Sequence, residues 1–99
     1  MLKIYAKEFA AIVKYLLGNP EKATRKNKFL VVDKSLLTEL LEKNNYEVSS
    51  KKLKVWKGLK WLDTDENRIT KRVTVNGTVK AMIKINLSVY ETLREIGNE

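Results

Sequence analysis

The segment from Arg68 to Asn86, RITKRVTVNGTVKAMIKIN, constrains the fold of this chain more than any other part. Two runs rich in β-branched residues flank Asn76-Gly77, a pattern that is typical of a β-hairpin. Lysine and arginine recur along both runs. The pattern therefore predicts an antiparallel ribbon that carries cationic side chains.

Two registers are open to this hairpin. A two-residue type I′ turn at Asn76-Gly77 would place an apolar residue opposite a charged one on successive rungs. A three-residue loop that ends at Thr78 would collect apolar pairs on one face, namely Val75–Val79, Val73–Ala81 and Ile69–Ile85. Because burial of one face selects the register, we predict the three-residue loop, with a polar and basic face on the other side.

Composition excludes much enzyme chemistry. The chain of 99 residues contains no cysteine and no histidine, which removes disulfides, thiol nucleophiles, thiolate or imidazole metal sites and histidine acid–base catalysis. The segment DTDEN at 63–67 begins like a calcium loop, but it lacks the glycine and the closing glutamate of that motif. We therefore expect no enzymatic activity, no cofactor and no metal.

The charge balance points to polyanionic partners. Lys and Arg number 20 against 12 Asp and Glu, a formal net charge of +8, and such an excess favours nucleic acid or an anionic surface. Glu8 and Lys14 interrupt the apolar N-terminal run, and no apolar stretch approaches the ~20 residues of a membrane span. We expect a cytoplasmic protein without membrane contact.

The length fits a single domain over residues 1–99. Apolar residues at helical spacing predict helices over 6–18, 34–44, 50–62 and the tail from 87. FLVV at 29–32 predicts a short strand, and the basic segment 21–28 predicts a loop. The predicted caps are Asp33 or Ser35, Ser49 or Ser50, and a capping box of Ser88 and Glu91. We thus expect an α+β fold with a three-helix core, a short strand, a hairpin and a C-terminal helix.

This order of elements resembles that of winged helix-turn-helix DNA-binding domains, and the segments Leu36 to Leu62 and Arg68 to Asn86 carry the resemblance. In size, Lys- and Asn-rich composition and element order, the chain also resembles the TcpK family, small winged-helix relaxosome proteins of clostridial conjugative plasmids. The resemblance implies a homodimer that binds repeated sites in double-stranded DNA near an origin of transfer. It also implies relaxase or coupling proteins as partners.

Basic and polar residues in four regions are the candidates for DNA contact. The outer face of the predicted helix 50–62 holds lysines but none of the Arg, Asn or Gln side chains that best discriminate bases. The wing offers both an Arg and an Asn, and the N-terminal segment and the loop 25–28 add further cations. We expect the wing, with help from the N-terminal segment, to supply much of the specificity, and the helix to contact phosphates. The candidate residues are Lys3, Lys7, Arg25, Lys51, Lys54, Lys57, Lys71, Arg72, Thr74, Asn76, Thr78 and Lys80.

Trp61 has two readings on this helical wheel. It lies on the outer face of the predicted helix 50–62, where it would form a dimer interface, or it packs under the wing or against the C-terminal helix. Because winged helices also serve as assembly adaptors, the alternatives to a relaxosome role are a transcriptional regulator and a protein-interaction adaptor.

Overall fold

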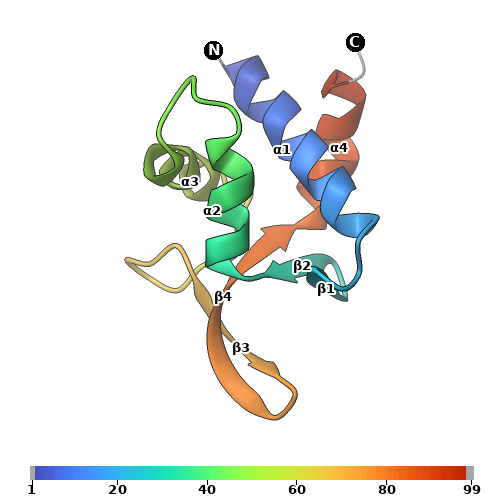
Figure 1. Ribbon diagram of the computed structural model, residues 1–99, viewed down its shortest axis with the longest axis vertical. Coiled ribbons are helices and arrows are strands. Elements are labelled where there is room, and N and C mark those ends of the chain that lie inside the picture. Colours follow the sequence, from blue (N-terminus) through green and yellow to red (C-terminus); the bar gives the residue numbers. More distant parts are fainter. Residues whose placement is uncertain (1, 98–99) are drawn as a thin grey trace.

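The protein combines four helices with a four-stranded antiparallel sheet in a computed structural model that describes residues 2–97 (Figure 1). The α+β class predicted from the sequence is confirmed. Among the described residues, no helix is long and apolar enough to cross a membrane. In chain order the elements are α1 (Leu2–Leu17), β1 (Ala23–Lys26), β2 (Phe29–Val32), α2 (Lys34–Glu42), α3 (Ser49–Gly58), β3 (Lys71–Val75), β4 (Thr78–Asn86) and α4 (Leu87–Gly97).

The nine-residue strand β4 organises the sheet, whose order is β1-β2-β4-β3. Its second half pairs with β2, from Ile83 opposite Val32 to Asn86 opposite Phe29. Its first half pairs only with β3. The two-stranded part, which we call the ribbon (residues 71–82), therefore extends beyond the helical body (Figure 1).

The turn of the ribbon corrects the predicted register. Val75 pairs with Thr78, so the turn consists of Asn76 and Gly77 alone, with φ values of 52° and 80°. Positive φ at both central positions defines a type I′ turn. The three-residue loop and its apolar pairs are wrong, because the ribbon stands clear of the core and burial does not select its register.

The segment 21–28 is also more ordered than predicted. Instead of a loop it contains β1, which pairs with β2 from Ala23 opposite Val32 to Lys26 opposite Phe29. β2 consequently lies inside the sheet, and Leu30, Val31 and Val32 are buried. Because β1 is an edge strand with three exposed residues out of four, it has no apolar run from which it could have been recognised.

An aromatic cluster fills the core, which lies between the sheet and the helices. Phe9 of α1 packs against Trp56 of α3 and against Trp61, with ring centroids 4.9 Å apart in both pairs. α1 and α4 lie side by side (Figure 1). Ile83 and Ile85 of β4 are fully buried beneath the helices. The inner half of β4 is thus anchored in the core, whereas its outer half is in the ribbon.

The end of α3 moves Trp61 from the predicted surface into the core. The helix ends at Gly58, and Lys60 adopts a left-handed φ of 65°. The backbone N–H of Trp61 then donates to the carbonyl of Trp56 at 2.9 Å, and that of Lys60 donates to Lys57 at 3.1 Å, as in a Schellman motif. The chain reverses there, so Trp61 is only 6% exposed. The predicted helix to residue 62 and the dimer interface at Trp61 are both wrong.

The helix starts agree with the predicted caps only in part. Asp33, one of the two predicted caps of α2, occupies its N-cap position, but its side chain makes no capping hydrogen bond. Val48 occupies the N-cap position of α3, so neither predicted serine does. At α4, Asn86 Oδ1 accepts from the N–H of Ser88 at 3.0 Å, which makes Asn86 the cap. Its place at the end of β4 puts the cap two residues earlier than the predicted capping box, in which Ser88 is the cap.

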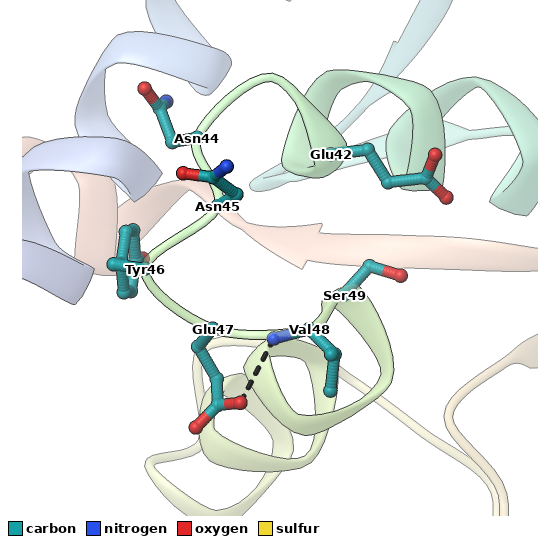
Figure 2. Close-up of a pocket in the computed structure, with 7 residues that line it drawn as sticks. All are labelled: Glu42, Asn44, Asn45, Tyr46, Glu47, Val48 and Ser49. Carbon is teal, nitrogen blue, oxygen red and sulfur yellow. Dashed lines mark hydrogen bonds between the residues drawn. The ribbon is translucent and has the colours of Figure 1, made fainter.

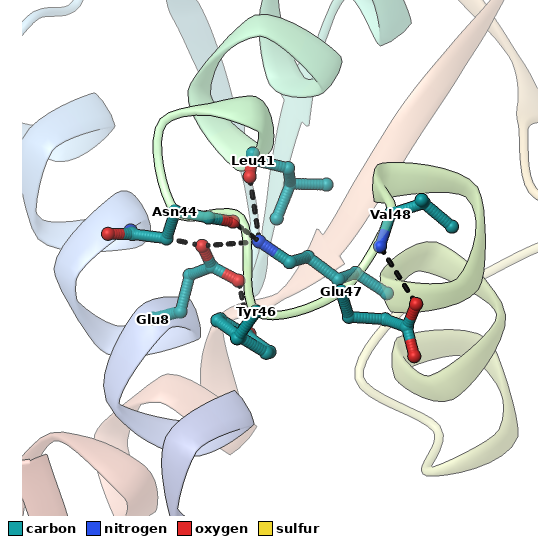
Figure 3. Close-up of polar contacts among 7 residues, drawn as sticks. Glu8, Leu41, Asn44, Tyr46, Glu47 and Val48 are labelled. Atoms are coloured by element: carbon teal, nitrogen blue, oxygen red, sulfur yellow. Dashed lines mark hydrogen bonds and ion pairs between the residues drawn. The ribbon is translucent and has the colours of Figure 1, made fainter.

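A buried ion pair fastens α3 to α1. Lys52 is fully buried, and its Nζ lies 3.0 Å from Glu8 Oε2 (Figure 3). The same Nζ donates to the carbonyl of Leu41 at 2.7 Å and to that of Asn44. Glu8 also accepts from the side chain of Asn44 at 3.1 Å and from the Tyr46 hydroxyl. Every strong donor and acceptor of the pair is thereby matched.

Burial raises the pKa of the Tyr46 hydroxyl above its usual value, and the hydrogen bond to Glu8 and the negative charge of that carboxylate add to the effect. The Lys52 ammonium lies 4.1 Å from the centre of the Tyr46 ring. The network therefore holds the α2–α3 turn and α3 in one position on α1.

Candidate nucleic-acid interface

The two faces of the ribbon differ in exposure. Because paired residues share a face of a sheet, Arg72 lies with Ala81 and Thr74 lies with Val79. All four are exposed, and Val79 is 64% exposed. We call this set the outer face of the ribbon. It presents one guanidinium among small side chains.

The opposite face of the ribbon is partly covered near the body, whereas Thr78 and Lys80 on the same face are exposed. Its half-buried residues are Lys71, Val73, Val75 and Met82. The Nζ of Lys26 in β1 donates to the backbone carbonyl of Thr74 at 2.6 Å. The predicted division of the hairpin into one apolar and one basic face is therefore replaced by an outer face with Arg72 and Thr74 and an inner face with Lys71 and Lys80.

Two carboxylates neutralise lysine charges at the end of the ribbon that joins the body. Lys71 Nζ lies 3.7 Å from Asp63 and 3.6 Å from Asp65, and Lys84 Nζ lies 3.1 Å from Asp63. Asp65 Oδ2 also accepts from the backbone N–H of Arg72 at 3.2 Å. The DTDEN segment thus holds the start of β3 in place. Lys71 is less available to an external anion than the sequence suggested.

The cations at the tip and on the outer face stay free of such pairs. Within residues 2–97, no carboxylate lies within ion-pair distance of Arg72 or Lys80. Asn76 and Thr78 are exposed at the turn. The part of the ribbon farthest from the body therefore keeps both its charge and its hydrogen-bonding groups for a partner.

On α3, the predicted lysines lie where the helical wheel placed them. Lys51 and Lys54 are exposed and Lys57 is half-buried. Lys52, which the sequence analysis did not single out, is the buried ionic residue. A helical wheel could have indicated that both charges are buried. Lys52 lies four residues before Trp56 on the apolar side of α3, and Glu8 lies four residues before Ile12 on the apolar side of α1.

A cationic hollow lies between α2, α3 and the loop that leads to β3. Its volume is about 390 Å³. It contains two candidate residues, Lys54 and Lys57, and two further cations that the sequence analysis missed, Lys34 and Arg68. Because these residues come from three separate segments, only the fold brings them together. The complete lining is Lys34, Lys54, Lys57, Asn67, Arg68, Ile69 and Thr70.

A second hollow has the opposite character. It lies at the α2–α3 turn, has a volume of about 600 Å³ and is lined by Glu42, Asn44, Asn45, Tyr46, Glu47, Val48 and Ser49 (Figure 2). Glu47 accepts from the backbone N–H of Val48 at 2.9 Å. With two carboxylates and no lysine or arginine in its lining, this turn is unsuited to a polyanion.

The structure does not bring all candidate cations to one surface. Lys3 and Lys7 lie in the first two turns of α1, and that end of α1 is opposite the tip of the ribbon along the longest dimension of the molecule, 41 Å (Figure 1). Arg25 is exposed on β1, next to the Lys26 that contacts the ribbon. The ribbon and the cationic hollow beside α3 are therefore the candidate interface, and Lys3 and Lys7 lie outside it.

Comparison with known proteins adds no assignment. No protein-family model matches the chain, and no curated protein matches its sequence.

Proposed function

We propose that this protein is a winged helix-turn-helix protein that binds double-stranded DNA, with the ribbon as its wing. A net charge of +8 on 99 residues supports a polyanionic partner. The order of α2, α3 and the ribbon supports the winged-helix assignment. The observation that carries the proposal is the outer face of the ribbon, where Arg72 and Thr74 project from a strand pair that stands clear of the body.

The shape of the ribbon suits a groove of DNA. A two-stranded antiparallel ribbon fits the major groove of B-DNA, and an arginine can also enter a narrow A·T-rich minor groove. In our proposal Arg72 reads a base edge or groove shape, and Thr74 and Asn76 add neutral hydrogen bonds. Val79 and Ala81 are small enough to let the ribbon approach closely and to contact a thymine methyl group.

The remaining cations supply affinity rather than discrimination. Lysine is a point charge that neutralises phosphate but lacks the planar fork of arginine. Lys51, Lys54 and Lys57 on α3 accordingly contact the sugar–phosphate backbone. Arg25 and Lys80 extend this contact along the side of the ribbon.

The resemblance to TcpK extends the proposal to a biological setting. We place the DNA site at an origin of transfer, where a homodimer acts with a relaxase or a coupling protein during conjugation. The interaction-adaptor alternative loses one part of the surface that suggested it, because Trp61 is buried within its own chain, and keeps the C-terminal helix. Footprinting across a plasmid distinguishes an origin of transfer from a promoter, the site expected of a transcriptional regulator.

Fluorescence anisotropy with duplex DNA tests the proposal. If about six phosphates are neutralised, log K should fall with log[salt] with a slope near −5. Arg72→Ala should cost about 1–3 kcal/mol on the preferred sequence and much less on random duplex. The matched control is Arg94→Ala, which removes an equal charge from α4, where Arg94 is exposed and 3.9 Å from Glu91.

Two results would contradict this reasoning. A salt slope near zero would exclude binding led by charge. An Arg72→Ala protein that kept both the affinity and the sequence preference of the wild type would remove the ribbon from the reading role.

A further inference from the structure

We infer that the cationic hollow seats a phosphate group of the DNA backbone, an inference that rests on the proposed function and assigns two residues, Lys34 and Arg68, that it does not include. Lys34 opens α2, and Lys54 and Lys57 lie three residues apart on one face of α3. Arg68 approaches from the loop before β3. Four cations thus converge on one hollow from three segments.

This convergence has no internal counter-charge. Among residues 2–97 no carboxylate lines the hollow. Asp33 and Glu66, the acidic residues nearest to Lys34 and Arg68 in sequence, form no ion pair with these cations among the described residues, and Asp63 and Asp65 are engaged by Lys71 and Lys84 instead. Because like charges repel, an arrangement of this kind is unfavourable in the free protein and favourable once an anion enters.

Backbone hydrogen bonds hold the Arg68 side of the hollow in place. The N–H of Arg68 donates to the carbonyl of Asp65 at 3.1 Å, and the N–H of Asp65 donates to the carbonyl of Thr70 at 3.1 Å. Asn67, between them, has a φ of 62°, a conformation that asparagine tolerates better than most residues. The loop is therefore closed on itself before any ligand arrives, which lowers the entropic cost of binding.

The chemistry of the lining selects a phosphate rather than a base. One guanidinium and three ammonium groups offer charge-assisted hydrogen bonds to oxyanions. Asn67 and Thr70 add neutral donors, and Ile69 gives an apolar patch for a sugar ring. On this assignment α3 lies against the backbone of the duplex, and base reading falls to the ribbon.

The experiment compares two double variants of the full chain in duplex binding. Lys54→Gln/Arg68→Gln removes two charges from the hollow, and Lys14→Gln/Lys43→Gln removes two exposed charges elsewhere. The hollow variant should flatten the salt slope by about one to two units and weaken specific and random duplexes by equal factors. Circular dichroism and thermal melting confirm that both variants are folded.

A modified duplex then locates the contact. Replacing single phosphates by neutral methylphosphonates should reveal one position that weakens the wild type by the same factor as the hollow variant and leaves that variant unaffected. If wild-type protein binds duplex DNA while the hollow variant retains the slope of the control, this inference fails and the proposed function stands. If wild-type protein does not bind duplex DNA, both fail.

A free anion is the other source of the same chemistry. Inorganic phosphate is added to the wild-type complex at constant ionic strength. We expect millimolar phosphate to leave the duplex bound. Displacement of the duplex from the wild type, but not from Lys54→Gln/Arg68→Gln, would assign the hollow to a small phosphate ligand and overturn the DNA assignment.

Discussion

Replacing Lys52 by methionine should destabilise the protein far more than replacing any exposed lysine. Methionine keeps most of the aliphatic stem but removes the ammonium, which lies 3.0 Å from Glu8 and 2.7 Å from the Leu41 carbonyl. The Glu8 carboxylate, only 3% exposed, then remains buried without its counter-ion. Its remaining partners are neutral donors from Asn44 and Tyr46.

The expected magnitude follows from this burial. Removing one partner of a buried ion pair typically costs about 3–5 kcal/mol, a large part of the roughly 5–15 kcal/mol that stabilises a domain. At ~4 °C or more per kcal/mol in a chain of this size, Tm should fall by at least about 12 °C. The double variant Glu8→Leu/Lys52→Met removes both charges, so it should be less destabilised than Lys52→Met alone.

Urea denaturation followed by tryptophan fluorescence measures both effects, since Trp56 and Trp61 are buried beside the network's helices. An unchanged m value confirms that only stability has changed. Lys51→Met, on the exposed side of the same helix, is the control and should lie within about 0.5 kcal/mol of the wild type. The reasoning is refuted if Lys52→Met costs less than about 1 kcal/mol, or if the double variant loses as much as the two single changes added together.

Three further predictions concern the Tyr46 hydroxyl and two backbone positions. Because the pKa of Tyr46 is raised, the folded chain keeps a proton that the unfolded chain releases at about pH 10. The stability advantage of the wild type over Tyr46→Phe, measured by urea titration, should therefore shrink above that pH, and a constant advantage would contradict this. Gly77→Ala should destabilise the ribbon by about 1–2 kcal/mol, because Gly77 has a φ of +80°, even though an added Cβ would meet open space. Hydrogen exchange of the β3 amides measures this loss, and unchanged exchange would argue against the type I′ turn. Lys60→Gly should have the opposite sign and raise Tm, because glycine adopts the left-handed C′ position without strain; a lower Tm would contradict the Schellman assignment.

Much of the architecture could be predicted from local pattern. Apolar spacing identified α2 within two residues of its observed end and placed α1 and α4, and the run FLVV identified β2. Asn76-Gly77 identified the ribbon, and the dipeptide alone also indicates its turn type. The predicted register was wrong because it assumed that one face of the hairpin would be buried along its whole length, whereas only the inner half of β4 reaches the core.

The candidate site was predicted only in part, because its members are joined by tertiary structure. Lys54 and Lys57 were found from the helical wheel, but Lys34 and Arg68 join them only after α2, α3 and the loop before β3 have packed. The helical wheel wrongly placed Trp61 on the surface because it extended α3 to residue 62. The helix in fact ends before Lys60, whose left-handed conformation could not be recognised from the sequence because the residue is not a glycine.

The sequence by itself determined the charge of this protein, its lack of cysteine and histidine chemistry, and the kinds of local structure that its apolar periods allow. These properties depend on residue identity and on neighbours within a few positions. The tertiary structure alone decided which charges are buried, which are neutralised and which converge. Burial and electrostatic interaction depend on distance in space, and residues such as Glu8 and Lys52 are 44 positions apart in the chain before folding brings them within 3.0 Å.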